Sequence, residues 1–136
     1  MSKPATETLS VIVEREVPFP PEKIWRALTQ PHLIEQWLMK NDFKPVVSHN
    51  FNLRADWGAV DCRVLAVEPS KALSYTWAAY GLESVVTFSL SPTGAGTRLR
   101  LEQSGFRRDQ EQAYRGATYG WPKFLAALDT LLGRLD

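Results

Sequence analysis

The stretch LSYTWAAYGLESVVTFSLSPTGAGTRLRL, which runs from Leu73 to Leu101, contains three segments in which apolar residues occupy alternate positions. These positions are Leu73, Tyr75 and Trp77, then Val86, Phe88 and Leu90, then Leu99 and Leu101. An alternation of period two predicts strands that bury one face. Gly81 separates the first two segments, and Pro92–Gly96 is a strong turn sequence before the third. Because the connections are short, we expect an antiparallel meander.

The same alternation continues toward the N-terminus. It predicts one strand around Phe51 and Leu53, and another around Cys62 and Val64 after a turn at residues 56–58. Either face of the second strand could point inward, because Leu65 and Val67 are also apolar. A first strand is predicted over residues 9–17, which brings the sheet to about six strands.

Two short helices are predicted between the first strand and the rest of the sheet. Prolines suit the first turn of a helix, and Pro20–Pro21 and Pro31 occupy such positions. Apolar residues then recur at helical spacing: Ile24, Trp25 and Leu28, followed by Leu33, Ile34 and Trp37. We expect a helical corner rather than one continuous rod.

A long helix is predicted at the C-terminal end of the chain. Its apolar stripe contains Tyr114, Ala117, Thr118, Trp121, Phe124, Leu125, Leu128, Leu131 and Leu132. Gly120 and Pro122 interrupt this stripe, so the helix is expected to kink or restart near residues 118–122.

Together these elements predict an α+β domain of the helix-grip type. A curved antiparallel sheet of about six strands would wrap around the long C-terminal helix, which covers the apolar face of the sheet. Residues 1–8 are expected to be a flexible lead-in, and residues 9–136 a single domain. Inward strand residues and the helix stripe would line any space left between sheet and helix.

The composition narrows the range of functions. The 136 residues carry a net charge of +1, which provides no general attraction to nucleic acid or anionic membranes. No apolar run approaches the roughly 20 residues that span a bilayer, and we expect a cytoplasmic protein. The single cysteine, Cys62, allows no internal disulfide. Five tryptophans are many for this length, which indicates either a heavy core or the wall of a pocket.

Four segments resemble the START-like (SRPBCC) ligand-binding superfamily, most closely the branch named after the activator of the heat-shock-chaperone ATPase. Pro20–Thr29 is similar to its opening helix, and Pro31–Trp37 to its second helix. Val64–Pro69 with Leu73–Trp77 resembles the middle hairpin, and Gly120–Leu128 the final helix. Ser48, where similar sequences carry glycine, and Pro20, where many carry a capping serine or aspartate, depart from the pattern.

The resemblance implies a helix-grip fold with an internal cavity but no single activity, since the superfamily contains lipid carriers, polyketide cyclases, chaperone activators and stress proteins. On this basis we expect a cavity that binds a hydrophobic or aromatic small molecule. Its expected lining is Trp37, Phe51, Leu53, Cys62, Val64, Trp77, Val86, Phe88, Leu101, Tyr114, Thr118, Trp121 and Phe124. His49 and Arg107 are candidates for polar contacts.

Other interpretations of these residues remain open. The aromatic set would equally suit a filled core, and the protein could instead be an interaction module that stimulates the heat-shock chaperone ATPase. A cyclase or hydratase would need an inward polar pair, such as His49 with Asp42 or Tyr114 with an acid. The sequence contains no catalytic motif, no metal-ligand spacing and no sign of a cofactor. Cys62 is expected to be a small buried apolar residue rather than a nucleophile.

Overall fold

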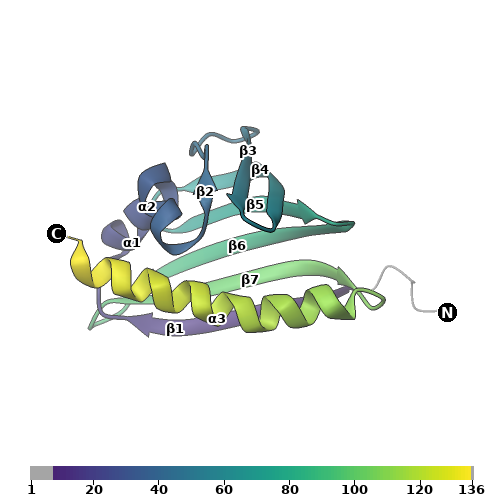
Figure 1. Ribbon diagram of the computed structural model, residues 1–136. Helices are drawn as coiled ribbons and strands as arrows, with labels where there is room; N and C mark the ends of the chain where they lie inside the picture. The colour runs from purple at the N-terminus through teal and green to yellow at the C-terminus, as the bar shows by residue number, and fades with distance from the viewer. Residues whose placement is uncertain (1–7, 136) are drawn as a thin grey trace.

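The computed structural model describes residues 8–135 and shows an α+β fold with one antiparallel sheet (Figure 1). The sheet has seven strands in the order β1-β7-β6-β5-β4-β3-β2. Their bounds are β1 Thr8–Val17, β2 Lys40–Asn41, β3 Asn50–Ala55, β4 Gly58–Glu68, β5 Ala72–Ala79, β6 Leu82–Pro92 and β7 Thr97–Arg107. The helices are α1 Pro21–Thr29, α2 Pro31–Trp37 and α3 Glu111–Arg134. The predicted helix-grip architecture is confirmed, with the two-residue β2 as an additional strand.

The N-terminal boundary differs slightly from the prediction. Residues 1–7 of the expected lead-in lie outside the described part of the chain, whereas Thr8 already belongs to β1 and pairs with Arg107 of β7. None of the helices within residues 8–135 is long and apolar enough to cross a membrane.

The alternating sequence determines how the sheet forms. Tyr75 pairs with Val86 and Phe88 with Leu101 across neighbouring strands, which places the apolar side chains on one face. The turn between β5 and β6 consists of Tyr80 and Gly81, both with positive φ. Two-residue hairpins favour such turns because their twist matches that of the strands.

The two short helices begin where the proline positions in the sequence predict them. Pro21 and Pro31 each occupy the first turn of their helix, where a missing N–H donor has no cost. Both helices bury one side against the core. The indole Nε1 of Trp37 donates a 2.8 Å hydrogen bond to the backbone oxygen of Ala27, which links α2 to α1.

Helix α3 lies across one face of the sheet, along β1 and β7, and its C-terminal end approaches α1 and α2 (Figure 1). The helix is continuous from Glu111 to Arg134, so the restart predicted near residues 118–122 is wrong. Pro122 lies inside the helix and is exposed, while its neighbour Trp121 is buried against the sheet. The burial of this apolar face compensates for the single backbone donor that proline removes.

A bulge in β7 changes which side chains point inward at the end of the sheet. Leu9 pairs with Phe106 and Ser10 with Ser104, so Gly105 is the extra residue of β7. Its φ of 112° is readily adopted only by glycine. After Gly105 the alternation is shifted by one residue, and Phe106 becomes fully buried beneath α3.

Candidate binding cavity

A cavity of about 370 Å³ lies between the N-terminal half of α3 and the sheet. This volume is within the range of small-molecule sites, roughly 300–1,000 Å³. The surface of the cavity is almost entirely apolar, and of the described residues that line it none carries a charge. The lining residues are Met39, Trp57, Trp77, Tyr80, Leu82, Gln103, Phe106, Ala113, Gly116, Ala117, Gly120, Trp121 and Phe124.

Small residues on α3 create this space. Ala113, Gly116, Ala117 and Gly120 follow one another at helical spacing and all line the cavity. A Cβ atom added at Gly116 would meet no atom within 4 Å, and one at Gly120 would only touch Phe124 at 4.0 Å. The helix therefore faces the sheet without side chains that could fill the gap.

Aromatic side chains form the inner wall. Trp77 of β5 and Trp121 of α3 lie with their ring centroids 5.3 Å apart, and Phe124 packs against Trp121 at 5.6 Å. Trp121 also makes an edge contact with Phe88 of the core, at 6.1 Å. The wall is thus continuous with the packed interior, which holds its rings in place.

Two exposed aromatic residues, Trp57 and Tyr80, stand at the rim of the cavity. Trp57 lies in the turn between β3 and β4, and Tyr80 in the turn between β5 and β6. The Tyr80 hydroxyl donates a 2.7 Å hydrogen bond to the backbone oxygen of Trp57, which ties the two turns together. Tyr80 is 80% exposed and adopts a φ of 50°, which is uncommon for a bulky residue.

One polar strip crosses the apolar wall. The indole Nε1 of Trp121 donates to Gln103 Oε1 at 2.7 Å, and Gln103 Nε2 donates to Ser84 Oγ at 2.9 Å. The Ser84 hydroxyl in turn donates to the backbone oxygen of Trp77 at 2.8 Å. Gln103 and Ser84 are both buried, so these partners compensate for the loss of contact with water.

The cavity takes up only part of the aromatic set predicted from the sequence. Trp77, Trp121 and Phe124 line it. Eight other predicted residues are buried in the packed core and are absent from the lining: Trp37, Phe51, Leu53, Cys62, Val64, Val86, Phe88 and Leu101. The pattern identified the inward face of the sheet correctly but could not separate core from cavity. It also left the inward face of β4 open, and the structure places Cys62 and Val64 inside.

The remaining two predicted lining residues lie on other parts of α3. Thr118 is exposed and its hydroxyl donates to the backbone oxygen of Tyr114 at 2.9 Å, so its predicted place in the wall is wrong. Tyr114 is half-buried, packs edge-on against Phe106, and donates to the backbone oxygen of Ser10 at 3.4 Å. It therefore contacts the cavity wall only through Phe106, and the acid partner considered for it is absent among its described contacts.

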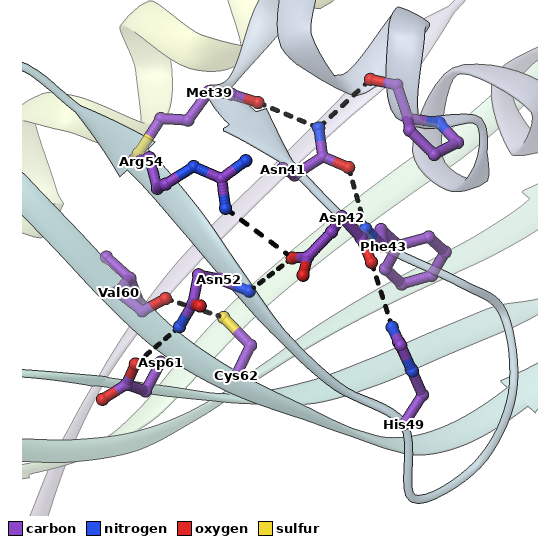
Figure 2. A network of polar contacts seen from close by, with 11 residues as sticks. Met39, Asn41, Asp42, Phe43, His49, Asn52, Arg54, Val60, Asp61 and Cys62 are labelled. Atoms are coloured by element: carbon purple, nitrogen blue, oxygen red, sulfur yellow. Dashed lines mark hydrogen bonds and ion pairs between the residues drawn. The ribbon is translucent and has the colours of Figure 1, made fainter.

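The candidate polar residues lie away from the cavity. His49 Nε2 lies 3.0 Å from the backbone oxygen of Asp42 (Figure 2). The Asp42 carboxylate instead accepts a 2.8 Å hydrogen bond from the backbone N–H of Asn52. The acid–base pair that an enzyme would need at His49 and Asp42 is therefore not formed. Arg107 is exposed at the end of β7, and its Nε donates to Asp109 at 3.3 Å. Within residues 8–135 no group of three or more His, Cys, Asp or Glu could hold a metal ion.

Cys62 behaves as a buried apolar group. Burial raises the pKa of its thiol well above the ordinary value, and the negative charges of Asp61 and Asp42 raise it further. A protonated thiol is a poor nucleophile. Burial likewise raises the pKa of Tyr75, which packs against Phe51 and Phe88.

A larger groove of about 570 Å³ lies on the opposite side of the sheet, but it is more open and more polar than the cavity beneath α3. Thr76, Ala78, Val85 and Ser104 line it, and these residues alternate with the inward-facing ones. None of the described residues that line it is aromatic, whereas aromatic side chains form the wall beneath α3. We therefore consider the cavity beneath α3 the candidate site.

Gln103 was not among the predicted lining residues, although the sequence carries a signal for it. Leu99, Leu101 and Gln103 occupy alternate positions, so the strand pattern already turns Gln103 inward. Trp57 and Tyr80 carried no such signal, because they reach the rim from turns.

Comparison with known proteins agrees with this architecture. The protein MLL2253 from Mesorhizobium loti is 63% identical, with 94% of this chain and 99% of that chain covered and a TM-score of 0.91. CalU16 from Micromonospora echinospora is 27% identical, with coverages of 98% and 82% and a TM-score of 0.82. DynU16, a protein in the dynemicin biosynthetic locus, is 25% identical with a TM-score of 0.83; 92% of this chain matches 47% of that longer chain.

No curated protein matches the chain. The sequence model of one family matches residues 18–133, which include strands β2–β7, helices α1 and α2, and all of α3 except Arg134, but not β1. The resemblance noted in the sequence is thereby confirmed, and this chain belongs to the family described as Activator of Hsp90 ATPase homolog 1-like protein, within the START-like superfamily.

Proposed function

We propose that this protein binds a hydrophobic or aromatic small molecule in the cavity beneath α3. The observation that carries the proposal is the row of small residues from Ala113 to Gly120, which leaves an apolar space open opposite Trp77 and Trp121. A filled core would place large side chains on this face of the helix. Binding would draw on the burial of apolar area, which contributes roughly 25 cal/mol per Å² before the costs of association.

Two further observations support this proposal. The exposed aromatic rim of Trp57 and Tyr80 could contact a planar molecule as it enters. The related protein DynU16 belongs to a biosynthetic locus, and this agrees with a role in small-molecule chemistry.

The experiment compares ligand-induced stabilisation in three proteins. Wild type, Gly120→Leu and Gly133→Leu are heated with a panel of fatty acids, sterols, polyketides and simple aromatics. A ligand that binds only the folded state raises the melting temperature by mass action. Leu at position 120 enters the cavity, whereas position 133 of the same helix is exposed and has no atom within 4 Å of an added Cβ.

We expect stabilisation of wild type and Gly133→Leu, and its loss in Gly120→Leu. Both variants should fold, because leucine favours a helix more than glycine does, by roughly 0.8 kcal/mol. If the whole panel fails to stabilise wild type, or if Gly120→Leu responds as strongly as wild type, the cavity is not the binding site.

A second candidate function is stimulation of the heat-shock chaperone ATPase, which the family description favours. This activity would use the outer surface of the domain. Gly120→Leu should then stimulate the chaperone as well as wild type does, whereas substitutions of exposed charges should weaken the effect. The absence of any stimulation by wild type would exclude this function.

A further inference from the structure

The hydrogen bonds around Gln103 determine the orientation of its amide group. An indole N–H can only donate, so the atom facing Trp121 must be the amide oxygen. Nε2 then faces Ser84 Oγ, which can accept because its own proton goes to the backbone oxygen of Trp77. Each group thus donates to the next, from Trp121 through Gln103 and Ser84 to the backbone oxygen of Trp77.

This arrangement leaves hydrogen-bonding capacity within the cavity. An amide has two N–H donors and two acceptor positions, and the contacts with Ser84 and Trp121 use one of each. Among residues 8–135 no other partner of this amide is present, so Gln103 still offers one N–H and one lone pair. Each remaining group is strengthened by the bond on the other side of the amide, because hydrogen bonds in a chain polarise one another.

The rest of the cavity offers no charge to balance an ionised ligand. Its described lining consists of apolar and aromatic side chains apart from Gln103, with Tyr80 at the rim engaged with Trp57. An unpaired carboxylate or ammonium group would lose its water here without a counter-ion, at a large cost. A neutral oxygen beside Gln103 would lose water but gain a partner.

We infer that Gln103 is the specificity-determining residue of the cavity and that it selects neutral aromatic molecules bearing a hydroxyl or carbonyl oxygen. The inference rests on the proposed binding function and narrows its ligand class. Trp77 and Trp121 hold the ring system, while the amide of Gln103 meets the oxygen. The hydrogen bonds to Trp121 and Ser84 keep that amide in position before the ligand arrives.

The test measures the dissociation constants of three naphthalenes for wild type at pH 7. 2-Naphthol carries a neutral hydroxyl, 2-methylnaphthalene replaces it with a methyl group of similar size, and 2-naphthoate is charged. We expect 2-naphthol to bind at least as tightly as 2-methylnaphthalene, and 2-naphthoate to bind more than tenfold more weakly than either. A hydroxyl without a partner would instead lower the affinity of 2-naphthol by roughly tenfold or more relative to the methyl compound.

Gln103→Met provides the matched variant, since methionine has a similar length but lacks the amide. This substitution should lower the affinity for 2-naphthol by roughly tenfold and leave the affinity for 2-methylnaphthalene almost unchanged. Gln36→Met, an exposed position on α2, serves as the control and should bind all three compounds as wild type does.

Several results would overturn the inference. The first is that wild type binds 2-naphthol tenfold more weakly than 2-methylnaphthalene. The second is that wild type binds 2-naphthoate most tightly of the three. The third is that Gln103→Met lowers the affinity for both neutral compounds by the same factor. In these cases the proposed binding function survives, because 2-methylnaphthalene or 2-naphthoate still binds wild type. If none of the three binds, the inference fails, and the panel of fatty acids, sterols, polyketides and aromatics decides whether the proposed function holds. If Gln103→Met does not fold, the affinities of wild type for the three naphthalenes decide whether the inference holds.

Discussion

The indole nitrogen of Trp121 in α3 donates a 2.7 Å hydrogen bond to the side-chain oxygen of Gln103 in β7. Both residues are only 2% exposed, so this bond crosses the apolar interface between helix and sheet. It fixes the angle of the Trp121 ring and the orientation of the Gln103 amide together. The cavity therefore has a defined polar point in an otherwise apolar wall.

Substitutions of Trp121 test how much its contacts contribute to the stability of the folded protein. Trp121→Ala should lower the free energy of unfolding by roughly 3–5 kcal/mol, because the indole contacts Trp77, Phe88 and Phe124. Trp121→Phe keeps much of the ring and should cost about 1–3 kcal/mol, mainly through the lost partner of Gln103. Urea unfolding measures both, with the exposed Tyr119→Ala as a control expected within about 0.5 kcal/mol of wild type. A loss below about 1 kcal/mol for Trp121→Ala would show that the indole does not anchor α3.

The bulge at Gly105 should tolerate no larger residue. A Cβ at this position would lie 2.8 Å from the backbone oxygen of Glu83, and the φ of 112° is unfavourable for other residues. Gly105→Ala is expected to lower the free energy of unfolding by at least about 1–3 kcal/mol. Gly94→Ala, where an added Cβ meets nothing within 4 Å, is the control and should change stability little.

The consequence for the cavity provides a second readout of Gly105→Ala. The bulge turns Phe106 beneath α3, so a change of register should alter the cavity wall and weaken ligand binding as well. Unchanged stability together with unchanged binding would contradict the role assigned to this bulge.

Stability should decrease in alkaline solution because of Cys62 and Tyr75. Burial raises the pKa of both groups in the folded chain, so they keep protons that the unfolded chain releases above roughly pH 8.5 for the thiol and 10 for the phenol. The free energy of unfolding is therefore expected to be unaffected by these groups below about pH 8 and to fall as the pH rises above it.

Cys62→Ala separates the two contributions. Urea unfolding between about pH 7 and 10.5 should show that this variant lacks the first part of the decline and retains the part due to Tyr75. The same slope between about pH 8.5 and 9.5 in variant and wild type would mean that the Cys62 thiol is not protected in the folded state.

The sequence predicted the fold because each strand carries its own alternation. Phe88 and Leu101 were assigned to the same inward face, and their pairing across β6 and β7 confirms it. Local pattern could not predict the continuity of α3 through Pro122, because the burial of Trp121 and Leu125 against the sheet outweighs the intrinsic effect of proline.

The cavity was harder to predict than the fold. It exists because Gly116 and Gly120 have no side chains, whereas the sequence pattern that predicts a pocket consists of large aromatic residues. Thr118 shares the spacing of the apolar stripe but lies on the exposed side of the helix. Phe106 points inward only because of the bulge at Gly105, which alternation alone does not reveal.

The five tryptophans provide the most direct test of the binding site, since each indole N–H gives its own signal in a ¹⁵N–¹H correlation spectrum. Trp57, Trp77 and Trp121 line the cavity, whereas Trp25 and Trp37 do not. During titration with 2-naphthol we predict that the signals of the three lining residues move together toward saturation while those of Trp25 and Trp37 stay in place. A titration in which the Trp77 and Trp121 signals remain fixed, or in which only Trp25 responds, would contradict binding in the cavity.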